Sequence, residues 1–209
     1  MRKEDGKWLS WLTQGRLSLI LIFLVIAVDQ WIKIAVKTNM FMHESIRVTD
    51  WFYILFTENP GMAFGWQFFD KIFLTSFRII AVAAIAYYLY RTIRRGAPTG
   101  FVVCLSLVLA GAAGNIIDCV FYGLIFNAPP APFVARFVPF GTGYGSAFLG
   151  RVVDMFYFPI IDTYWPDWMP WVGGDHFVFF SPIFNFADAA ISCGIIAMLI
   201  FYHKRIAGQ

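Results

Sequence analysis

Three aspartates lie inside or beside long apolar runs of the chain. Asp118 follows GAAGNII, Asp154 follows GRVV and Asp188 follows SPIFNFA. Carboxylates at membrane depth are costly, so they are usually functional and have polar partners. If these three converge at one depth, two of them can share a proton. The charged member would then act as general base on a water, and the neutral member would donate a hydrogen bond to a carbonyl. This pattern predicts an intramembrane aspartic hydrolase.

Asparagines precede two of these aspartates by three positions, Asn115 before Asp118 and Asn185 before Asp188. Residues three apart share a face of a helix. The small residues of GAAG, just before Asn115, would let another helix approach closely and let polar groups meet. The sequence therefore predicts that the asparagines and aspartates meet at a helix contact.

Asp29 and Lys33 are four apart in the first apolar run and are expected to form an ion pair. The pair could belong to an active site, or it could neutralise itself near the interface with Lys33 snorkelling to water. The sequence contains no serine, cysteine or histidine constellation that competes with the acids. We expect no metal site, since there is no CxxC pattern and the histidines are scattered.

The composition is that of a membrane protein. Of 209 residues, 59% are apolar and 14% are charged, which is too much apolar side chain for one soluble core. The formal charge of +3 and the lack of a long basic cluster give no reason to expect nucleic acid. We interpret the chain as one domain, residues 1–209, that retains its N-terminal apolar run. Four spanning helices are predicted, over about 17–36, 72–90, 101–122 and 183–202.

Arginine and lysine predict the orientation. They precede the first span, lie between the second and third spans, and follow the fourth. An even number of spans places these three groups on one side, which the positive-inside rule makes cytoplasmic. Both termini are then inside, and the segments of about 38–71 and 123–182 are outside together with the acids. The site is therefore expected to face the periplasm.

The two outer segments differ in composition. SIRVTDWFYILFTENPGMAFG is rich in strand-forming residues and contains an Asn-Pro-Gly turn signal, so we expect a short antiparallel sheet at the membrane surface. The second segment begins rich in proline, glycine and alanine and continues rich in aromatic residues. Tryptophan and tyrosine at this density are typical of the headgroup region. This part could be an interfacial belt, or a flap that covers a site or holds a lipidated ligand.

In five blocks the chain resembles the bacterial lipoprotein signal peptidases, also called type II signal peptidases. The blocks occur in order as DQWIK, ENPGMAFG, GAAGNIID, VVDMF and FNFADAAI. The resemblance implies an all-α membrane protein, with four transmembrane helices, an outer β-cradle and a small surface helix. It also implies an aspartic endopeptidase of the inner membrane that needs no metal or organic cofactor. Such enzymes cut a prolipoprotein just before a cysteine that carries a diacylglyceryl group.

The resemblance also assigns roles to residues. The catalytic pair corresponds to Asp154 and Asp188. Residues that surround or orient the pair correspond to Asp29, Lys33, Asn59, Gly111, Asn115, Asp118 and Asn185. The expected partners are the prolipoprotein and membrane lipid, with the enzyme acting as a monomer.

Two departures from the family pattern matter. Cys119 stands where the family usually has arginine, and Arg151 is our candidate to replace it. The family commonly has only a short connection between the GNxxD and VVD blocks, whereas Cys119 to Gly150 intervene here. This insertion could form a lid or an interfacial element. It also leaves Asp118 as an alternative to Asp154 as partner of Asp188, and we favour Asp154 for its Val-Val-Asp context.

Two other function classes compete with the peptidase. A small proton-coupled transporter or channel would also use intramembrane carboxylates, but it would need polar residues at several depths. Here the acids cluster toward one end of the spans. A non-catalytic protein that binds lipoproteins would tolerate loss of the acids. Separate replacement of Asp154 and Asp188 by asparagine distinguishes these classes from the peptidase.

Overall fold

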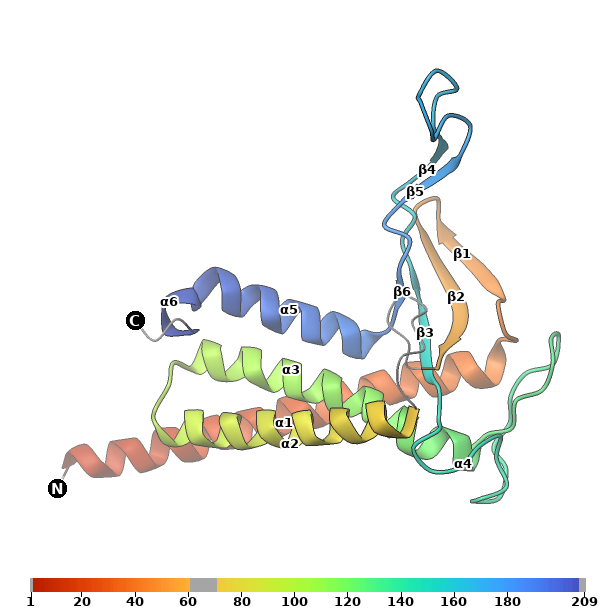
Figure 1. Cartoon of the computed structure of the whole chain (residues 1–209). Coiled ribbons are helices and arrows are strands. Elements are labelled where there is room, and N and C mark those ends of the chain that lie inside the picture. Colours follow the sequence, from red (N-terminus) through yellow and green to blue (C-terminus); the bar gives the residue numbers. More distant parts are fainter. Residues whose placement is uncertain (1, 61–70, 207–209) are drawn as a thin grey trace.

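The structure is a computed structural model that describes the backbone of residues 2–60 and 71–206 (Figure 1). Most of the ENPGMAFG block, and the Asn-Pro-Gly turn beyond Pro60, lie outside the described residues. The helices are α1 (Arg2–Asn39), α2 (Lys71–Arg94), α3 (Thr99–Ile117), a π-helical turn η1 (Asp118–Tyr122), α4 (Gly123–Ile125), α5 (Phe186–Phe201) and α6 (His203–Ile206). The strands are β1 (Ser45–Thr49), β2 (Phe52–Asn59), β3 (Val152–Tyr157), β4 (Ile161–Tyr164), β5 (His176–Phe179) and β6 (Ile183–Phe184).

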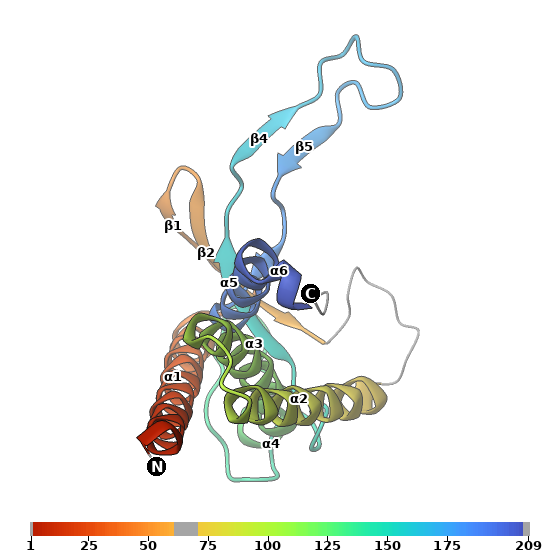
Figure 2. The ribbon, with the colours of Figure 1, turned by 90° about the vertical axis from the view of Figure 1, so that its left-hand side faces the viewer.

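The long helices form a bundle in which α3 contacts α1, α2 and α5 (Figures 1 and 2). Their outward positions are apolar: Phe23, Trp31, Ile80 and Phe201 are all exposed. Asp29, Lys33 and Lys37 of α1 are instead buried. This is the pattern of a protein whose surrounding solvent is lipid.

Three helical stretches are long and apolar enough to cross a membrane: Thr13–Asn39, Lys71–Arg94 and Thr99–Ile125. These stretches include the first three predicted spans and extend beyond the expected bounds of each. The fourth is shorter than predicted, since residues 183 and 184 form β6 and α5 begins at Phe186. α5 has 16 residues. At 1.5 Å per residue its length is about 24 Å, against about 30 Å of hydrocarbon.

A four-stranded antiparallel sheet lies at one end of the bundle, in the order β1-β2-β3-β6. The first turns of α1 and the short helix α6 lie at the opposite end (Figure 1). The predicted sheet is confirmed for β1 and β2, whereas β3 and β6 were not predicted as strands. The end of the bundle that carries this sheet is called the sheet end below.

A second, two-stranded sheet of β4 and β5 is inserted between β3 and β6. In both views it extends away from the bundle, across the direction of the long helices (Figures 1 and 2).

The segment from Cys119 to Gly150, predicted as an insertion, begins by continuing α3 through η1 and α4. It then forms an irregular loop that returns to its start, where the Gly150 N–H donates to the Cys119 carbonyl over 2.8 Å. Because the two ends of this segment meet, Asp118 and β3 remain in contact although many residues separate them in the sequence. The Val153 N–H donates to Asp118 Oδ2 over 3.3 Å.

Candidate active site

The N-terminus of α5 positions Asn185 and Asp188. Asn185 is the N-cap residue, and its side-chain oxygen accepts a hydrogen bond from the Asp188 N–H over 2.9 Å. Asp188 Oδ2 accepts from the Asn185 N–H over 3.4 Å, which completes a capping box. The spacing of three residues is therefore that of a helix cap. The expectation that both residues lie within the helix is wrong for Asn185, which has an extended backbone.

Asp154 lies next to this cap because β3 pairs with β6, the strand that leads into α5. Asn185 Nδ2 donates to Asp154 Oδ1 over 2.6 Å. Asp154 is 4% exposed. Burial, and then the charge of Asp188, raise the pKa of Asp154 to about 7. Asp154 and Asp188, called the aspartate pair below, thus share Asn185 as a neighbour and interact electrostatically.

Asn115 on α3 connects this pair to a second polar group. Its Nδ2 donates to Asp188 Oδ1 over 2.7 Å. Its Oδ1 accepts from Asn185 Nδ2 over 3.1 Å and from Lys33 Nζ over 2.7 Å. Asn115 is therefore oriented by donors on α1 and at the start of α5, with its amide directed at Asp188.

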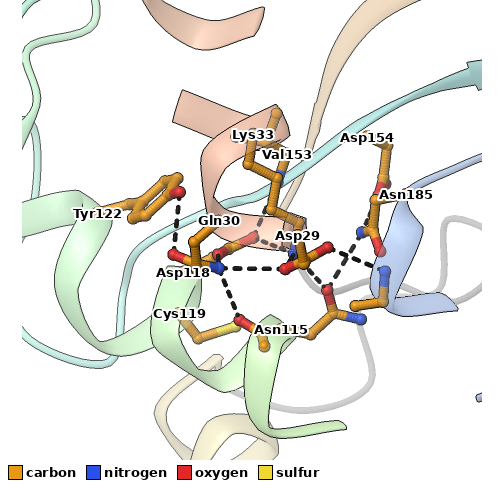
Figure 3. A network of polar contacts seen from close by, with 12 residues as sticks. Asp29, Gln30, Lys33, Asn115, Asp118, Cys119, Tyr122, Val153, Asp154 and Asn185 are labelled. Atoms are coloured by element: carbon orange, nitrogen blue, oxygen red, sulfur yellow. Dashed lines mark hydrogen bonds and ion pairs between the residues drawn. The ribbon is translucent and has the colours of Figure 1, made fainter. Parts of the chain in front are cut away.

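The second polar group consists of Asp29, Lys33 and Asp118, called the lysine centre below (Figure 3). Lys33 Nζ lies 2.9 Å from Asp29 Oδ2 and 2.8 Å from Asp118 Oδ2, and all three side chains are 0% exposed. Gln30 Nε2 donates to both carboxylates, at 3.2 and 2.8 Å respectively. The predicted Asp29–Lys33 pair is present, but the snorkelling alternative is wrong because Lys33 is fully buried and binds a second acid.

Small residues allow α1, α3 and α5 to approach closely around these groups. A Cβ at Gly111 would lie 2.3 Å from the Ala187 carbonyl oxygen, and a Cβ at Gly114 would lie 2.9 Å from Asp29 Oδ2. The close approach lets Asp29 Oδ1 accept the Ala187 N–H of α5 over 2.9 Å. The lysine centre therefore also caps the helix that carries Asp188.

The structure brings together Asp29, Lys33, Gly111, Asn115, Asp118, Asp154, Asn185 and Asp188, of the residues singled out in the sequence. Asn59 ends β2 opposite Val152, two residues before Asp154. Arg151 is separate from the group. It is 44% exposed, and its Nη1 pairs with Glu58 Oε2 over 3.2 Å.

The guanidinium beside Cys119 belongs to Arg78 of α2, whose Nη1 lies 3.6 Å from Cys119 Sγ. Arg151, our candidate for that place, is instead held by Glu58. Arg78 was missed, although a single arginine inside an apolar span is a signal for a functional or structural role. Lys37 and Glu58, which form a buried ion pair, were also missed.

Within residues 2–60 and 71–206, no group of three or more histidine, cysteine or acidic side chains is arranged to hold a metal ion. The site described above contains carboxylates and amides. They are arranged as an acid with a raised pKa next to a second carboxylate, both oriented by amide side chains.

Comparison with known proteins gives matches to one family. The sequence model of the family "Signal peptidase (SPase) II" matches residues 21–204. The lipoprotein signal peptidase of Porphyromonas gingivalis is 49% identical over 203 residues, which cover 97% of this chain and 89% of that protein. The lipoprotein signal peptidase of Amoebophilus asiaticus is 38% identical, covering 89% of this chain and 76% of that protein.

A solved bacterial membrane enzyme has a similar fold, with a TM-score of 0.58 and 26% identity. The match covers 88% of this chain and 90% of that one. A second such enzyme matches with a TM-score of 0.60 at 24% identity, over 92% of this chain and 91% of that one. With its apolar helices, this chain is a membrane protein, and by the extent of the sequence matches it belongs to the signal peptidase II family.

Proposed function

We propose that the chain is an aspartic endopeptidase that removes the signal peptide from diacylglyceryl-modified prolipoproteins, with Asp154 and Asp188 as catalytic residues. The observation that carries the proposal is the position of Asn185. Its amide donates to Asp154, and its side-chain oxygen fixes the first turn of the helix that presents Asp188. Two acids held by one residue, without a cation in contact with either in the described chain, suit a shared proton.

The surroundings of the two acids favour different roles. Asp154 has a pKa raised to about 7 by burial and by the charge of Asp188, so it can hold the proton at neutral pH. Asp188 lies at the positive end of a helix and accepts hydrogen bonds from Asn115 Nδ2 and the Asn185 N–H. This environment suits an ionised carboxylate. We therefore assign Asp188 as general base and Asp154 as general acid in the first step.

Asp188 takes a proton from a water, and the water oxygen attacks the carbonyl carbon of the scissile peptide. Asp154 gives its proton to the carbonyl oxygen, so the tetrahedral intermediate is uncharged. In the second step the C–N bond breaks and the leaving nitrogen, which belongs to the lipidated cysteine, takes the proton from Asp188. The remaining hydroxyl proton returns to Asp154, which restores the initial state.

Asp118 is the alternative partner of Asp188, and its contacts argue against this role. Its carboxylate is bound by Lys33, Gln30 and the Val153 N–H. These three donors occupy the carboxylate of Asp118, which leaves it little capacity to share a proton with Asp188. We assign the lysine centre to positioning, because Asn115 and the Ala187 N–H connect it to the active acids.

The position of the aspartate pair fits a lipid-anchored substrate. It lies at the sheet end, opposite the termini and the arginine-rich turn after α2. The positive-inside rule places the termini in the cytoplasm of a bacterial cell and the pair at the periplasmic side of the inner membrane. Each buried methylene of the diacylglyceryl group contributes about 0.8 kcal/mol to membrane binding, so the scissile bond is held at interface depth.

The two rival functions have less support. A proton path would need titratable groups along the bundle, but the buried cluster near the start of α3 is formed by apolar side chains such as Leu89, Ile93 and Phe101. A binding protein without activity would not need an acid whose pKa is raised to near neutrality.

The direct test is to incubate the purified, membrane-reconstituted protein with a diacylglyceryl-modified precursor and with its unmodified counterpart. We expect mass spectrometry to show cleavage just before the modified cysteine, and no cleavage of the unmodified peptide. Equal cleavage of both peptides would refute the lipid requirement. Absence of cleavage by folded protein would refute the peptidase assignment itself.

A further inference from the structure

The hairpin formed by β4, β5 and the loop 165–175 has two different faces. In its register Ile161 lies opposite Phe179 and Thr163 opposite Phe177, all on one face because strand side chains alternate. The Trp165 ring packs on Phe177 with centroids 4.7 Å apart. We call this side the apolar face of the hairpin.

The other face of the hairpin is polar. Asp162 lies opposite Val178, and Tyr164 lies opposite His176. His176 Nε2 contacts Asp162 Oδ1 at 2.5 Å, and the Tyr164 and His176 rings lie 5.1 Å apart. The hairpin is therefore amphipathic, because successive side chains of each strand point to opposite faces.

The apolar face is uncovered in the described structure. Phe179 is 52% exposed, and at the loop Trp168 and Trp171 are 79% and 98% exposed. Among the described strands, β4 and β5 pair only with each other. A single two-stranded hairpin is marginally stable in water, and large exposed aromatic groups usually mark a binding surface.

The direction of the hairpin indicates what covers it. The spanning helices set the membrane normal along the bundle, and the hairpin extends across that direction at the sheet end (Figures 1 and 2). It therefore runs along the membrane surface. Tryptophan and tyrosine favour the headgroup region, where one side of a ring is apolar and its N–H or O–H reaches water.

We propose that the apolar face of the hairpin, with Trp168 and Trp171, binds the headgroup region of the leaflet at the sheet end, and that the Asp162–His176 face points to water. The binding surface is lipid, and no protein partner is required. The hairpin leaves β3, which carries Asp154, and returns through β6 to α5, which carries Asp188. If the proposed function holds, this lipid contact also fixes the depth of the aspartate pair.

Two neighbouring residues of β5 provide a matched test. Phe179 and Val178 are adjacent but point to opposite faces, so a spin label on each compares the two faces at one position along the hairpin. The labels are attached as Phe179→Cys and Val178→Cys in a background whose native cysteines, Cys104, Cys119 and Cys193, are replaced by alanine. Each labelled protein is reconstituted in vesicles of phosphatidylethanolamine and phosphatidylglycerol, and its relaxation by oxygen and by a water-soluble nickel complex is measured.

We expect oxygen to relax the label at 179 more strongly than the label at 178. We expect the nickel complex to relax the label at 179 severalfold less than the label at 178. Strong nickel relaxation at both positions would show a hairpin standing in water and would overturn the proposal. Protection of position 179 from both reagents would show packing against protein, such as a second copy, and would also overturn it. The measurement does not depend on cleavage, so its outcome is separate from that of the peptidase test.

Discussion

The lysine centre and the aspartate pair are connected through Asn115, yet their acids have different partners. Asp29 and Asp118 contact Lys33, whereas Asp154 contacts an amide and lies near the charge of Asp188. Asn115 touches both groups. Under the proposed function, the acids bound by Lys33 position the site, and the acid with amide partners holds the proton that is transferred.

The largest expected effect separates the two groups directly. Asp154→Asn and Asp188→Asn should each lower the cleavage rate by about 10²–10⁴-fold, because general acid–base catalysis is lost. Asp118→Asn is the matched buried control. It keeps an acceptor oxygen for Lys33, so we expect a loss of no more than about tenfold.

Cleavage of a lipidated precursor, with circular dichroism to verify folding, measures these rates. A variant at Asp118 as inactive as those at Asp154 and Asp188 would mean that the wrong pair has been assigned.

Removal of the Lys33 charge should lower the unfolding free energy more than removal of a lysine charge at the surface. Lys33→Met leaves two buried carboxylates without their partner, at a cost of about 3–5 kcal/mol of unfolding free energy. Lys204→Met makes the same chemical change at an exposed position and should stay within about 0.5 kcal/mol of the parent. Denaturant unfolding in detergent compares the two. Equal stability of both variants would contradict a structural role for Lys33.

The connection between the groups can be cut at Asn115. Asn115→Ala removes the hydrogen bond to Asp188, and hydrogen bonds to charged groups contribute about 1.5–3 kcal/mol. We therefore expect cleavage to slow by about 10- to 100-fold. Asn39→Ala, at an exposed position whose side-chain amide donates to Ala35 and Thr38 of α1, is the control. An unchanged rate in the Asn115 variant would show that the two groups act independently.

The pH dependence should come from the aspartate pair. Since the pKa of Asp154 is about 7, cleavage should fall as the pH rises above about 7 and the general acid is lost. The folded protein holds this proton where the unfolded chain has released it. The stabilising contribution is therefore complete below about pH 4 and is lost as the pH rises through about 7.

Unfolding measured in detergent across this pH range tests the linkage. Asp154→Asn should flatten the change in unfolding free energy, and an identical slope in parent and variant would rule out Asp154 as its source.

The smallest expected effect is that of a metal chelator on the cleavage rate. Chelation with EDTA should leave the cleavage rate unchanged, since both groups act through carboxylates and amides. If EDTA abolished cleavage and zinc restored it, the proposed mechanism of a shared proton would be wrong and a metal-dependent mechanism would be indicated.

Sequence could predict those parts of the molecule that depend on local pattern. The apolar runs predicted three spans closely, and the charges placed both termini at one end. The Asp29–Lys33 pair followed from helical spacing. What depends on distant contacts was not predictable: the pairing of β3 with β6, the second acid bound by Lys33, and the amphipathic hairpin. No local signal in VVDMF shows that this stretch is the third strand of a sheet.

The sequence indicated which polar residues come together, but it did not indicate how they are arranged. Asn185 and Asp188 were expected on one helix face, but the chain is extended through Ile183 and Phe184, and Asn185 caps the helix instead. Arg151 was our candidate to replace the arginine that the family usually has at the position of Cys119. Packing brings Arg78 there from another helix, and only the fold determines such a contact.

The brevity of α5 has a consequence for the surrounding lipid. A helix of 16 residues is shorter than the hydrocarbon layer, so lipids beside it must compress or tilt their chains to match it. Asp188 lies in the first turn of this helix, and Ile195, Ile196 and Leu199 are exposed farther along it. Local thinning there would draw headgroups and water inward, so that water reaches the acids without the protein opening a channel.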